Sequence, residues 1–544
     1  MRADFSLDYD VVTLKRAQRL YLMARFESGP AAEDRERRPL NLSLVIDRSG
    51  SMGGNKIDYT RQAAQFLVQH LSAKDTLSIV LYNEQVTTLL TPEKVRQKDN
   101  INQQIARIKA GGTTNLSGGW LEGCRLVSQN LEDDVINRVI LMSDGLANRG
   151  VTDSDKLVSM AQQKFQEKIS TTTMGMGDEF NEDLLMEMAN GGGGAYYFIE
   201  SPEVAPFIFQ EELQGLLNVV GQNLVISIIP TKQVTQIRQL NAYQKHTDGK
   251  IHSFRLGDVF GEEIKTLMLE LSVPALKDLG EKEIALLRFE YDELLEDGTK
   301  HHTIELPVVV NVAAEGEQPA LADPKVKESV LLLKAAQARR EAVKFADSGE
   351  FETAADVLSQ AADAIKESGI ESPELADEQT ALTEEAGTMQ RGKERYTRHT
   401  RKVMSTQAIY SMTSRHDDTR VLRDREQLRN TQAMPVVPHK DTPIQRKEGV
   451  APTHVSWKEK TFLLDKDLVR IGRATHNEIV VQATGVSRFH CQIKRKDGQM
   501  ILEDVGSTNG TMMSGKVLTE SHTLSVGDVA YLCDAKLVFH DGSE

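Results

Sequence analysis

The stretch "NLSLVIDRSGSMGG", residues 41–54, places an aspartate and two serines directly after an apolar segment. Asp47, Ser49 and Ser51 form the pattern D-x-S-x-S, and the neighbouring glycines let the backbone bend tightly enough for these short side chains to converge. All three side chains present oxygen. Carboxylate and hydroxyl oxygens suit a hard divalent cation such as Mg²⁺ or Mn²⁺, so the pattern predicts a metal site.

Two later segments could complete this site. "GGTTNLSGG" carries Thr114 just before a predicted helix, with Thr113 as an alternative, and "VILMSDG" carries Asp144 after another apolar segment. One alternative is structural, because serine and aspartate also cap helices. Another is enzymatic, because an aspartate at a strand end can accept a phosphoryl group with the help of Mg²⁺. Ser49 argues against a phosphoryl-transfer enzyme, because such phosphotransferases usually carry a second aspartate two residues after the first, where this chain has Ser49.

A second group of candidate residues lies within the last ninety residues, in "RIGRATHNEIVV", "GVSRFHCQI" and "LEDVGSTNGTMMSG". A phosphate group offers three acceptor oxygens and about −1.5 to −2 charges at neutral pH, so an arginine fork with hydroxyl and amide donors binds it well. The structural alternative to phosphate binding is that these motifs form ordinary turns and that Arg473 is a surface residue. The candidate donors are Arg473, Ser487, Arg488, Thr508 and Asn509.

The metal candidates require a particular kind of sheet. Between about residues 40 and 219, apolar strand-like segments alternate with helical ones, which predicts a mainly parallel sheet covered by helices on both faces. In an open sheet of this kind, ligands bind outside the carboxyl ends of the strands. Asp47 and Asp144 each follow such a strand, so we expect them to meet at one edge.

The segments on either side of this α/β region have a different pattern. Residues 1–38 and 220–313 show short alternating runs that predict antiparallel strands. Because one piece precedes the α/β region and the other follows it, we expect the two to pair into one β-sandwich, with the α/β domain of residues 39–219 inserted.

Three further parts follow towards the C-terminus. Residues 323–430 have helical spacing and predict a spacer built from a helical hairpin and a third helix, whose basic stretch 391–430 we expect to be a solvated helix or linker. Prolines without periodicity mark residues 431–453 as a flexible linker. Short strands return over 454–544 and predict a small all-β sandwich.

The α/β region resembles a von Willebrand factor A (vWA) domain with an intact metal-ion-dependent adhesion site. The resemblance implies a doubly wound, Rossmann-like fold. It also implies five ligand positions for Mg²⁺ or Mn²⁺, with one coordination position left open for an aspartate or glutamate of a protein partner. These positions are Asp47, Ser49, Ser51, Thr114 and Asp144.

The C-terminal region resembles a forkhead-associated (FHA) domain along its whole length. The resemblance implies that Arg473, Ser487, Thr508 and Asn509 recognise phosphothreonine, and that Arg488 contacts the peptide backbone or the phosphate. Such a partner would be phosphorylated by a Ser/Thr kinase. Packing and turn roles are implied for Gly472, His490 and Gly510.

Composition limits the class of protein further. A net charge of −15 and a pI near 5.5 argue against binding to nucleic acid or anionic membranes. The three cysteines are scattered, which favours reduced thiols and a cytoplasmic location. The sequence contains no run of 18 apolar residues, so we expect no membrane span.

Together these features predict a non-catalytic adaptor that binds one protein through a metal ion and another through phosphothreonine, in kinase-linked signalling. The alternatives are a Mg²⁺-dependent phosphoryl-transfer enzyme that uses Asp47 and a structural subunit of a larger assembly. A further hypothesis is that a phosphorylated linker threonine, Thr406 or Thr419, binds the FHA domain of the same chain.

Overall fold

A computed structural model of the 544-residue chain divides it into two compact units, Met1–His416 and Asp417–Glu544, and each is described by itself. The residues that the structure describes are 1–29, 38–132, 135–145, 148–199, 205–295, 298–314, 322–413, 450–457, 460–466, 468–473, 477–481, 483, 486, 490–496, 498–505, 507, 511–513, 516–518, 521–532 and 535–541.

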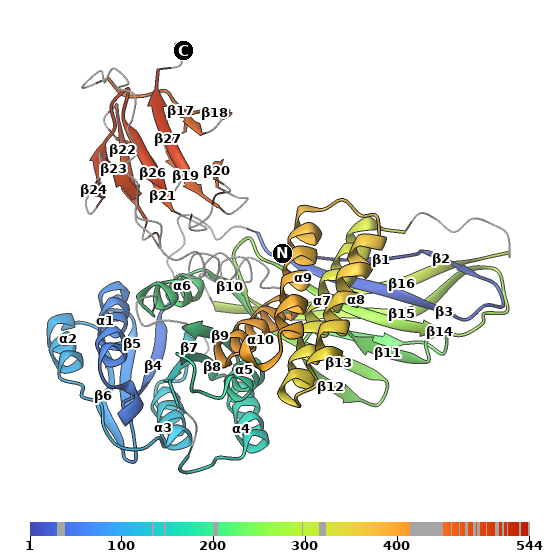
Figure 1. Cartoon of the computed structure of the whole chain (residues 1–544), viewed down its shortest axis with the longest axis horizontal. Helices are drawn as coiled ribbons and strands as arrows, with labels where there is room; N and C mark the ends of the chain where they lie inside the picture. Colours follow the sequence, from blue (N-terminus) through green and yellow to red (C-terminus); the bar gives the residue numbers. More distant parts are fainter. Residues whose placement is uncertain are drawn as a thin grey trace. The chain divides into compact units, whose positions relative to one another are not determined.

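The α/β domain of the first unit is built on a six-stranded sheet (Figure 1). All neighbouring strands run parallel except β6, which pairs antiparallel with β5 at one edge. Every residue of β4, β5, β7 and β8 is buried, as expected for parallel strands that are covered on both faces. In spatial order the strands are β6 (Val86–Lys94), β5 (Thr76–Tyr82), β4 (Leu40–Asp47), β7 (Ile136–Ser143), β8 (Ser170–Met176) and β9 (Gly193–Ile199).

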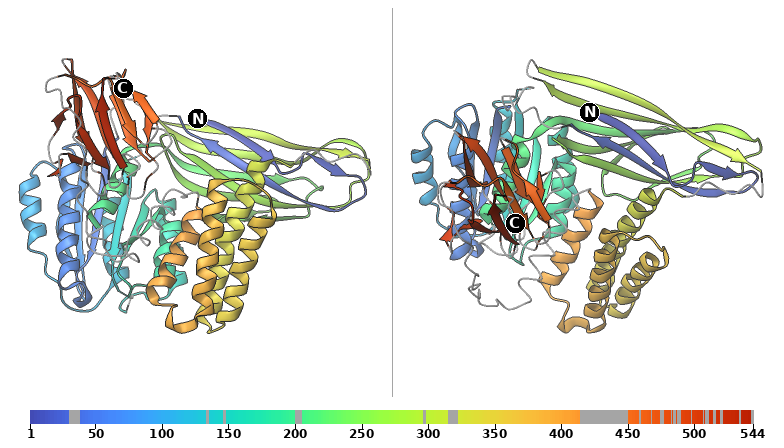
Figure 2. Two further views of the ribbon diagram at one scale, coloured as in Figure 1. Left: turned by 45° about the horizontal axis from the view of Figure 1, so that its top comes forward. Right: turned by 90° about the horizontal axis from the view of Figure 1, so that it is seen from above.

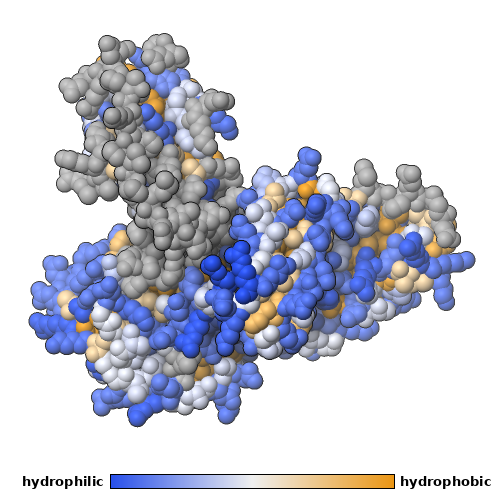
Figure 3. Space-filling model, viewed as in Figure 1, coloured by the Kyte–Doolittle hydropathy of each residue, from blue (hydrophilic) through white to orange (hydrophobic). Residues whose placement is uncertain are grey.

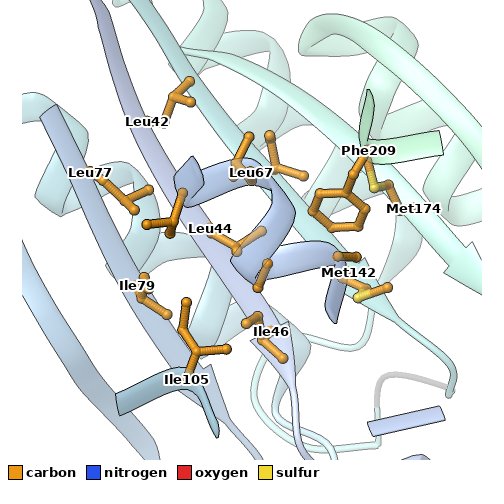
Figure 4. Packing of buried hydrophobic residues seen from close by; sticks show 14 of the residues in the cluster. Leu42, Leu44, Ile46, Leu67, Leu77, Ile79, Ile105, Met142, Met174 and Phe209 are labelled. Atoms are coloured by element: carbon orange, nitrogen blue, oxygen red, sulfur yellow. The ribbon is translucent and has the colours of Figure 1, made fainter. Parts of the chain in front are cut away.

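Alternate residues of the strands meet different layers of helices. Helices α1 (Asn55–His70), α2 (Lys98–Ala106) and α6 (Ala205–Leu217) form one apolar core with the sheet. Figure 4 shows side chains of β4 and β5 in this core beside residues of all three helices. On the other face, Thr171 of β8 accepts a hydrogen bond from Trp120, and Thr173 donates one to Leu185 O. These contacts place α3 (Leu116–Ser128) and α5 (Glu182–Gly191) there, with α4 (Ser154–Gln166) packed against α5.

Close packing of α3 on the sheet explains two glycines inside this helix. A Cβ on Gly119 would lie 2.6 Å from the Tyr82 ring, and a Cβ on Gly123 would lie 2.5 Å from Val45 Cγ2. Glycine weakens a helix interior, but here its missing side chain lets α3 approach the strands that carry Asp47 and Asp144. In Figure 3, hydrophilic residues cover most of the visible outer surface of the helices of this domain.

A β-sandwich forms the second part of the first unit. Its four-stranded sheet has the order β1 (Arg2–Leu7), β3 (Gln18–Glu27), β14 (Ile264–Val273), β11 (Gln236–Gln239). Its six-stranded sheet has the order β12 (Gln244–Asp248), β13 (Ile251–Phe260), β10 (Val219–Pro230), β15 (Gly280–Leu295), β16 (Gly298–Ala313), β2 (Val11–Thr13).

Strands from both ends of the inserted domain share this sandwich (Figure 2). Strand β3 pairs with β14, β2 pairs with β16, and one apolar core fills the space between the sheets. Within that core the Phe26 ring lies 6.3 Å from the Phe289 ring and 4.8 Å from the Tyr291 ring. The predicted insertion of the α/β domain into a β-sandwich is therefore confirmed.

A buried ionic cluster joins the α/β domain to the sandwich. Arg138 of β7 donates to Thr172 Oγ1 over 2.9 Å, lies 3.5 Å from Glu212 of α6, and pairs with Asp258 of β13. Burial raises the pKa of the Asp258 carboxyl, and the Arg138 guanidinium opposes that rise. A buried charge without its partner is very unfavourable, so this cluster holds the two domains in one arrangement.

Four helices follow the sandwich. Helix α7 (Pro324–Asp347) lies on the outer face of the four-stranded sheet, where Val330 and Leu333 contact Met23 and Met268. Asp323 and Ser372 cap two of the helices, each followed by proline in the first turn. The other helices are α8 (Phe351–Glu367), α9 (Pro373–Gln390) and α10 (Arg398–Met412), with a short 3-10 turn, η3 (Gly392–Glu394), before α10.

Helix α10 differs from the sequence prediction. We expected residues 391–430 to be a solvated helix or linker, but Lys402 is buried and donates to Phe180 O at 2.6 Å and Glu182 Oε2 at 2.5 Å. The expectation was wrong for α10 because tertiary ion pairs neutralise its cations. Thr406 is fully buried, so the folded helix does not offer it to a kinase, while Thr419 lies outside the described residues.

The second unit is a β-sandwich, as predicted for the C-terminal region. Both sheets contribute to one core, which includes Ile471 and Leu502 from one sheet and Leu537 and Phe539 from the other. One sheet has the order β18 (Lys460–Leu463), β17 (His454–Trp457), β27 (Ala535–His540), β26 (Val529–Leu532), β23 (Thr511–Met513), β24 (Lys516–Val517). The other has the order β20 (Ile479–Val480), β19 (Leu468–Gly472), β21 (Cys491–Lys496), β22 (Gln499–Asp504), β25 (His522–Thr523).

No helix within the described ranges is long and apolar enough to cross a membrane.

Replacing Arg138 tests the ionic cluster between the domains. We expect Arg138→Met to lower the free energy of unfolding of the first unit by about 3–5 kcal/mol, because Glu212 and Asp258 would stay buried without their cation. Urea unfolding followed by circular dichroism measures the loss. Arg125→Ala removes an exposed pair with Glu122 and serves as the control, with an expected loss below about 0.5 kcal/mol. Equal losses in the two variants would contradict the assignment.

Candidate metal centre and phosphate pocket

The five predicted metal-site residues lie at one edge of the α/β sheet. Asp47 ends β4, Asp144 directly follows β7, and Thr114 lies in the loop before α3. Ser49 and Ser51 stand at the start of the short turn η1 (Gly50–Met52) that leads into α1. Because β4 and β7 are parallel neighbours, their carboxyl ends bring these oxygens to one place.

Hydrogen bonds connect four of the five residues directly. The Ser49 N–H donates to Asp47 Oδ1 at 2.8 Å, and the Ser49 and Ser51 hydroxyl oxygens are 3.1 Å apart. Ser51 Oγ donates to Asp144 Oδ1 at 2.8 Å. The fifth residue is close by, because a Cβ on Gly145 would lie 3.5 Å from Thr114 Oγ1 and 3.8 Å from Ser51 Oγ.

The loop before α3 shows which threonine faces the site. Thr114 is buried, whereas Thr113 is exposed and its N–H donates to Glu84 Oε2 at 2.9 Å. The Thr114 N–H donates to Asn148 Oδ1 at 3.1 Å, and Gly50 N donates to Gly112 O at 2.9 Å. These bonds tie the loop to the turn that carries the serines, so the geometry favours Thr114 over Thr113.

Burial makes the pair of carboxylates unfavourable without a cation. Asp47 and Asp144 are both fully buried. Burial raises the pKa of the Asp47 carboxyl to about 6, and the nearby Asp144 carboxylate adds to the rise, against hydrogen bonds from Ser49 and Ser143. Two buried carboxylates with three hydroxyls suit a hard divalent ion, because its charge offsets theirs and its preferred ligands are oxygens. The residues present therefore fit Mg²⁺ or Mn²⁺.

The described residues hold no cluster of three or more His, Cys, Asp or Glu side chains that could bind a metal. In the donor set above, only two of the five side chains are carboxylates.

Sequence reasoning missed two residues beside the carboxylates. Ser143 Oγ donates to Asp47 Oδ2 at 3.0 Å, and Lys56 Nζ lies 2.5 Å from Asp144 Oδ2. Ser143 precedes Asp144 in "LMSDG" and Lys56 follows the glycines of "SMGGNK", so both stand near the motif in sequence. Only the three-dimensional structure shows that the side chains of Ser143 and Lys56 contact the carboxylates.

Three of the predicted FHA residues lie in the described part of the second unit. Arg473 follows β19, and its Nε donates to Val486 O at 3.2 Å, one residue before Ser487. His490 is fully buried and its N–H donates to Ile471 O at 2.8 Å. Gly472 is buried at the end of β19. Outside the described residues lie Ser487, Arg488, Thr508, Asn509 and Gly510.

Two carboxylates not singled out from the sequence hold the segments that carry the pocket residues. Asp504 accepts hydrogen bonds from Ser507 and Thr511, at 2.6–2.7 Å, on either side of residues 508–510. Glu478 accepts from the Arg470 N–H at 2.9 Å and from its guanidinium. Asp504 therefore links Ser507 and Thr511, the residues that flank positions 508–510, and Glu478 supports the strand that leads to Arg473.

The two units contain two known kinds of domain. Residues 41–211 match the sequence model of the von Willebrand factor type A domain, and residues 469–532 match that of the FHA domain. The chain therefore carries a von Willebrand factor type A domain and a C-terminal FHA domain, as both resemblances indicated.

Relatives and solved structures extend this comparison. The uncharacterized protein sll0103 of Synechocystis is 28% identical over 370 residues, which cover 66% of this chain and 85% of that protein. The uncharacterized protein YfbK of Escherichia coli is 27% identical over 279 residues, 49% of this chain, and the match spans about half of that relative, 48%. The solved von Willebrand factor type A protein from Catenulispora acidiphila has a TM-score of 0.54 at 16% identity, over 68% of this chain and 87% of that one. At this identity the likeness concerns the fold alone, and it extends well beyond residues 41–211.

The carboxylates of the second unit predict acid sensitivity. Burial alone would raise the pKa of both Asp504 and Glu478. Hydrogen bonds from Ser507 and Thr511 nevertheless hold the pKa of Asp504 below its ordinary value, and hydrogen bonds from Arg470 lower the pKa of Glu478 to about 2. A carboxyl whose pKa is lower in the folded state contributes stability that is present above its unfolded pKa and lost as the pH falls. We expect the second unit to lose stability below about pH 4.5.

Fluorine NMR of fluorotryptophan-labelled protein can follow this loss, because the chain has two tryptophans and Trp457 is the one in the second unit. We expect Asp504→Asn to destabilise the unit at pH 7, and the difference from the wild type to shrink towards pH 2. A difference that is independent of pH would contradict the role of Asp504.

Proposed function

We propose that the protein is a non-catalytic adaptor with two separate receptors for anionic groups. The α/β domain binds a divalent metal ion, Mg²⁺ or Mn²⁺, whose open coordination position accepts an aspartate or glutamate of a protein partner. The FHA domain binds a phosphothreonine written on another protein by a Ser/Thr kinase. The observation that carries the proposal is the convergence of Asp47, Ser49, Ser51, Thr114 and Asp144 at one sheet edge.

Charge supports the role of the metal. Two carboxylates only neutralise a divalent ion, so no excess negative charge would keep a third anionic ligand from the ion's open coordination position. The ligand residues would be Asp47, Ser49, Ser51, Thr114 and Asp144, and the metal would supply the electrostatic link to the partner's carboxylate. The buried cluster around Arg138 supports partner binding at the metal site, because it fixes the α/β domain to the β-sandwich.

For the FHA domain, support comes from the neighbourhood of Arg473. Its guanidinium bonds to Val486 O beside Ser487, and Asp504 holds the ends of the segment with Thr508 and Asn509. We propose that Arg473, Ser487, Arg488, Thr508 and Asn509 contact the phosphopeptide. A cytoplasmic setting belongs to this proposal, and Cys124 and Cys491, which are buried free thiols, agree with it.

The phosphoryl-transfer alternative finds less support. Asp47 is fully buried, and both of its carboxylate oxygens accept hydrogen bonds, one from Ser49 and one from Ser143. A nucleophile needs a free oxygen that faces the substrate. The geometry of Asp47 suits a ligand or an organiser of the turn better than an attacking group.

The metal site can be tested by direct binding. We expect Asp144→Asn to weaken Mn²⁺ binding at least about tenfold, because it removes one of the two carboxylate charges. Electron paramagnetic resonance of free Mn²⁺ measures the affinity. Asp99→Asn is the matched control, because Asp99 is exposed in the first turn of α2. Unchanged affinity in Asp144→Asn would refute the assignment of the site.

The proposed phosphate pocket is tested with a phosphothreonine peptide that carries isoleucine or leucine three residues later, as Ile409 follows Thr406 and Leu422 follows Thr419 in this chain. We expect Arg473→Ala to cost about 1.5–3 kcal/mol of binding free energy, the range for a hydrogen bond to a charged group. Lys496→Ala is the control. Lys496 is an exposed cation at the end of β21, whereas Cys491 at the start of β21 pairs with Ile471, two residues before Arg473. Calorimetry gives both values, with the unphosphorylated peptide as a blank.

Affinity capture from cell extract separates the candidate functions. Partners lost with EDTA and with Asp144→Asn belong to the metal site, and partners lost with phosphatase and with Arg473→Ala belong to the FHA domain. Partners that withstand both treatments and both substitutions would instead favour a structural subunit of a larger assembly.

A further inference from the structure

Lys56 is the one charged side chain that bonds directly to a predicted metal ligand among the described residues. It stands in the first turn of α1, and its Nζ lies 2.5 Å from Asp144 Oδ2. Lys56 keeps 25% of its side chain exposed, whereas Asp144 is fully buried. This is therefore not an ordinary surface ion pair, whose contribution would be small.

Local helix chemistry does not explain a lysine at this position. The amino end of a helix carries partial positive charge, so a cation in the first turn is unfavourable there. The side chain lies beside Gly177 in the loop after β8, where a Cβ would be 3.6 Å from Lys56 Cε and 3.7 Å from its Nζ. A residue that opposes its local preference and meets a buried carboxylate suggests a functional constraint.

Lys56 and the metal ligands use different oxygens of Asp144. Ser51 Oγ donates to Oδ1 at 2.8 Å, while Lys56 bonds to Oδ2. The side of Asp144 that faces Ser51, Ser49 and Thr114 therefore stays available to a metal ion while the lysine is in place. The ammonium group and a metal ion can be present together.

We propose that Lys56 is a built-in counter-ion of the metal site, which weakens metal binding but leaves the loaded site with a net positive charge that attracts an anionic ligand. This inference rests on the proposed metal site. Without the lysine, two carboxylates and a divalent ion sum to zero. With Lys56 the sum is +1, so the partner's carboxylate meets an attractive charge.

The two effects have opposite signs and can be measured separately. A neutral residue at position 56 removes repulsion between two cations, so we expect Lys56→Met to bind Mn²⁺ about tenfold more tightly than the wild type. Electron paramagnetic resonance of free Mn²⁺ gives this value. Lys56→Arg keeps the charge and should bind like the wild type.

Lys94→Met is the matched control for charge. Lys94 is exposed, pairs with Thr76 at the start of β5, and therefore lies at the sheet edge opposite to the metal site. Its Nζ donates to one backbone oxygen, Lys74 O. We expect Mn²⁺ affinity in this variant within about twofold of the wild type, because salt screens charges at such separation.

Acetate serves as the probe for the anionic ligand. When acetate replaces water on bound Mn²⁺, the relaxation rate of the water protons falls, and a titration gives the acetate affinity. We expect acetate to bind the Mn²⁺-loaded Lys56→Met variant at least about threefold more weakly than the loaded wild type, because one positive charge is missing.

The outcomes distinguish this inference from the proposed metal site. If the wild type binds Mn²⁺ but Lys56→Met neither tightens Mn²⁺ binding nor weakens acetate binding, the role of Lys56 is refuted and the site stands. If the wild type and Asp144→Asn are equally unable to bind Mn²⁺, the metal site itself is refuted. Circular dichroism checks folding, and Lys56→Gln replaces the methionine variant if that variant does not fold.

Discussion

Two buried carboxylates at the ends of parallel strands impose the main constraint on the first unit. Asp47 and Asp144 lie where β4 and β7 end, away from water, and Asp144 disfavours the charge of Asp47. Such an arrangement persists only when hydrogen bonds and positive charge compensate for lost hydration. The serines and Lys56 serve this compensation, and a divalent ion would complete it.

Two sets of ion pairs hold the α/β domain in place. The Arg138 cluster fixes the α/β domain to the sandwich, and α10 fastens the helical part to the same domain through Lys402 and Glu182. For the proposed receptor, this support would reduce the ordering that a partner must impose on binding. The FHA domain belongs to a separate compact unit with its own core.

Much of the fold could be predicted because its local patterns agree with one another. The continuous apolar runs of β4 and β7 indicate strands buried on both faces, and the alternating runs before and after them indicate one shared sandwich. Prediction failed for α10, where Lys402, Ser405 and Thr406 suggest solvent but are buried. Glu182, the carboxylate that pairs with Lys402, lies 220 residues away in sequence, so no local pattern could reveal this pair.

The sequence by itself determined which residues offer oxygens after the strands and the three motifs of the C-terminal domain, because these depend on residue type and short spacing. Only the tertiary structure decided that Thr114 is buried beside the site while Thr113 is exposed, and that Lys56 bonds to Asp144. It also decided that Asp504 links Ser507 to Thr511. The physical reason is that charge pairing and burial depend on distances across the fold, which spacing along the chain does not specify.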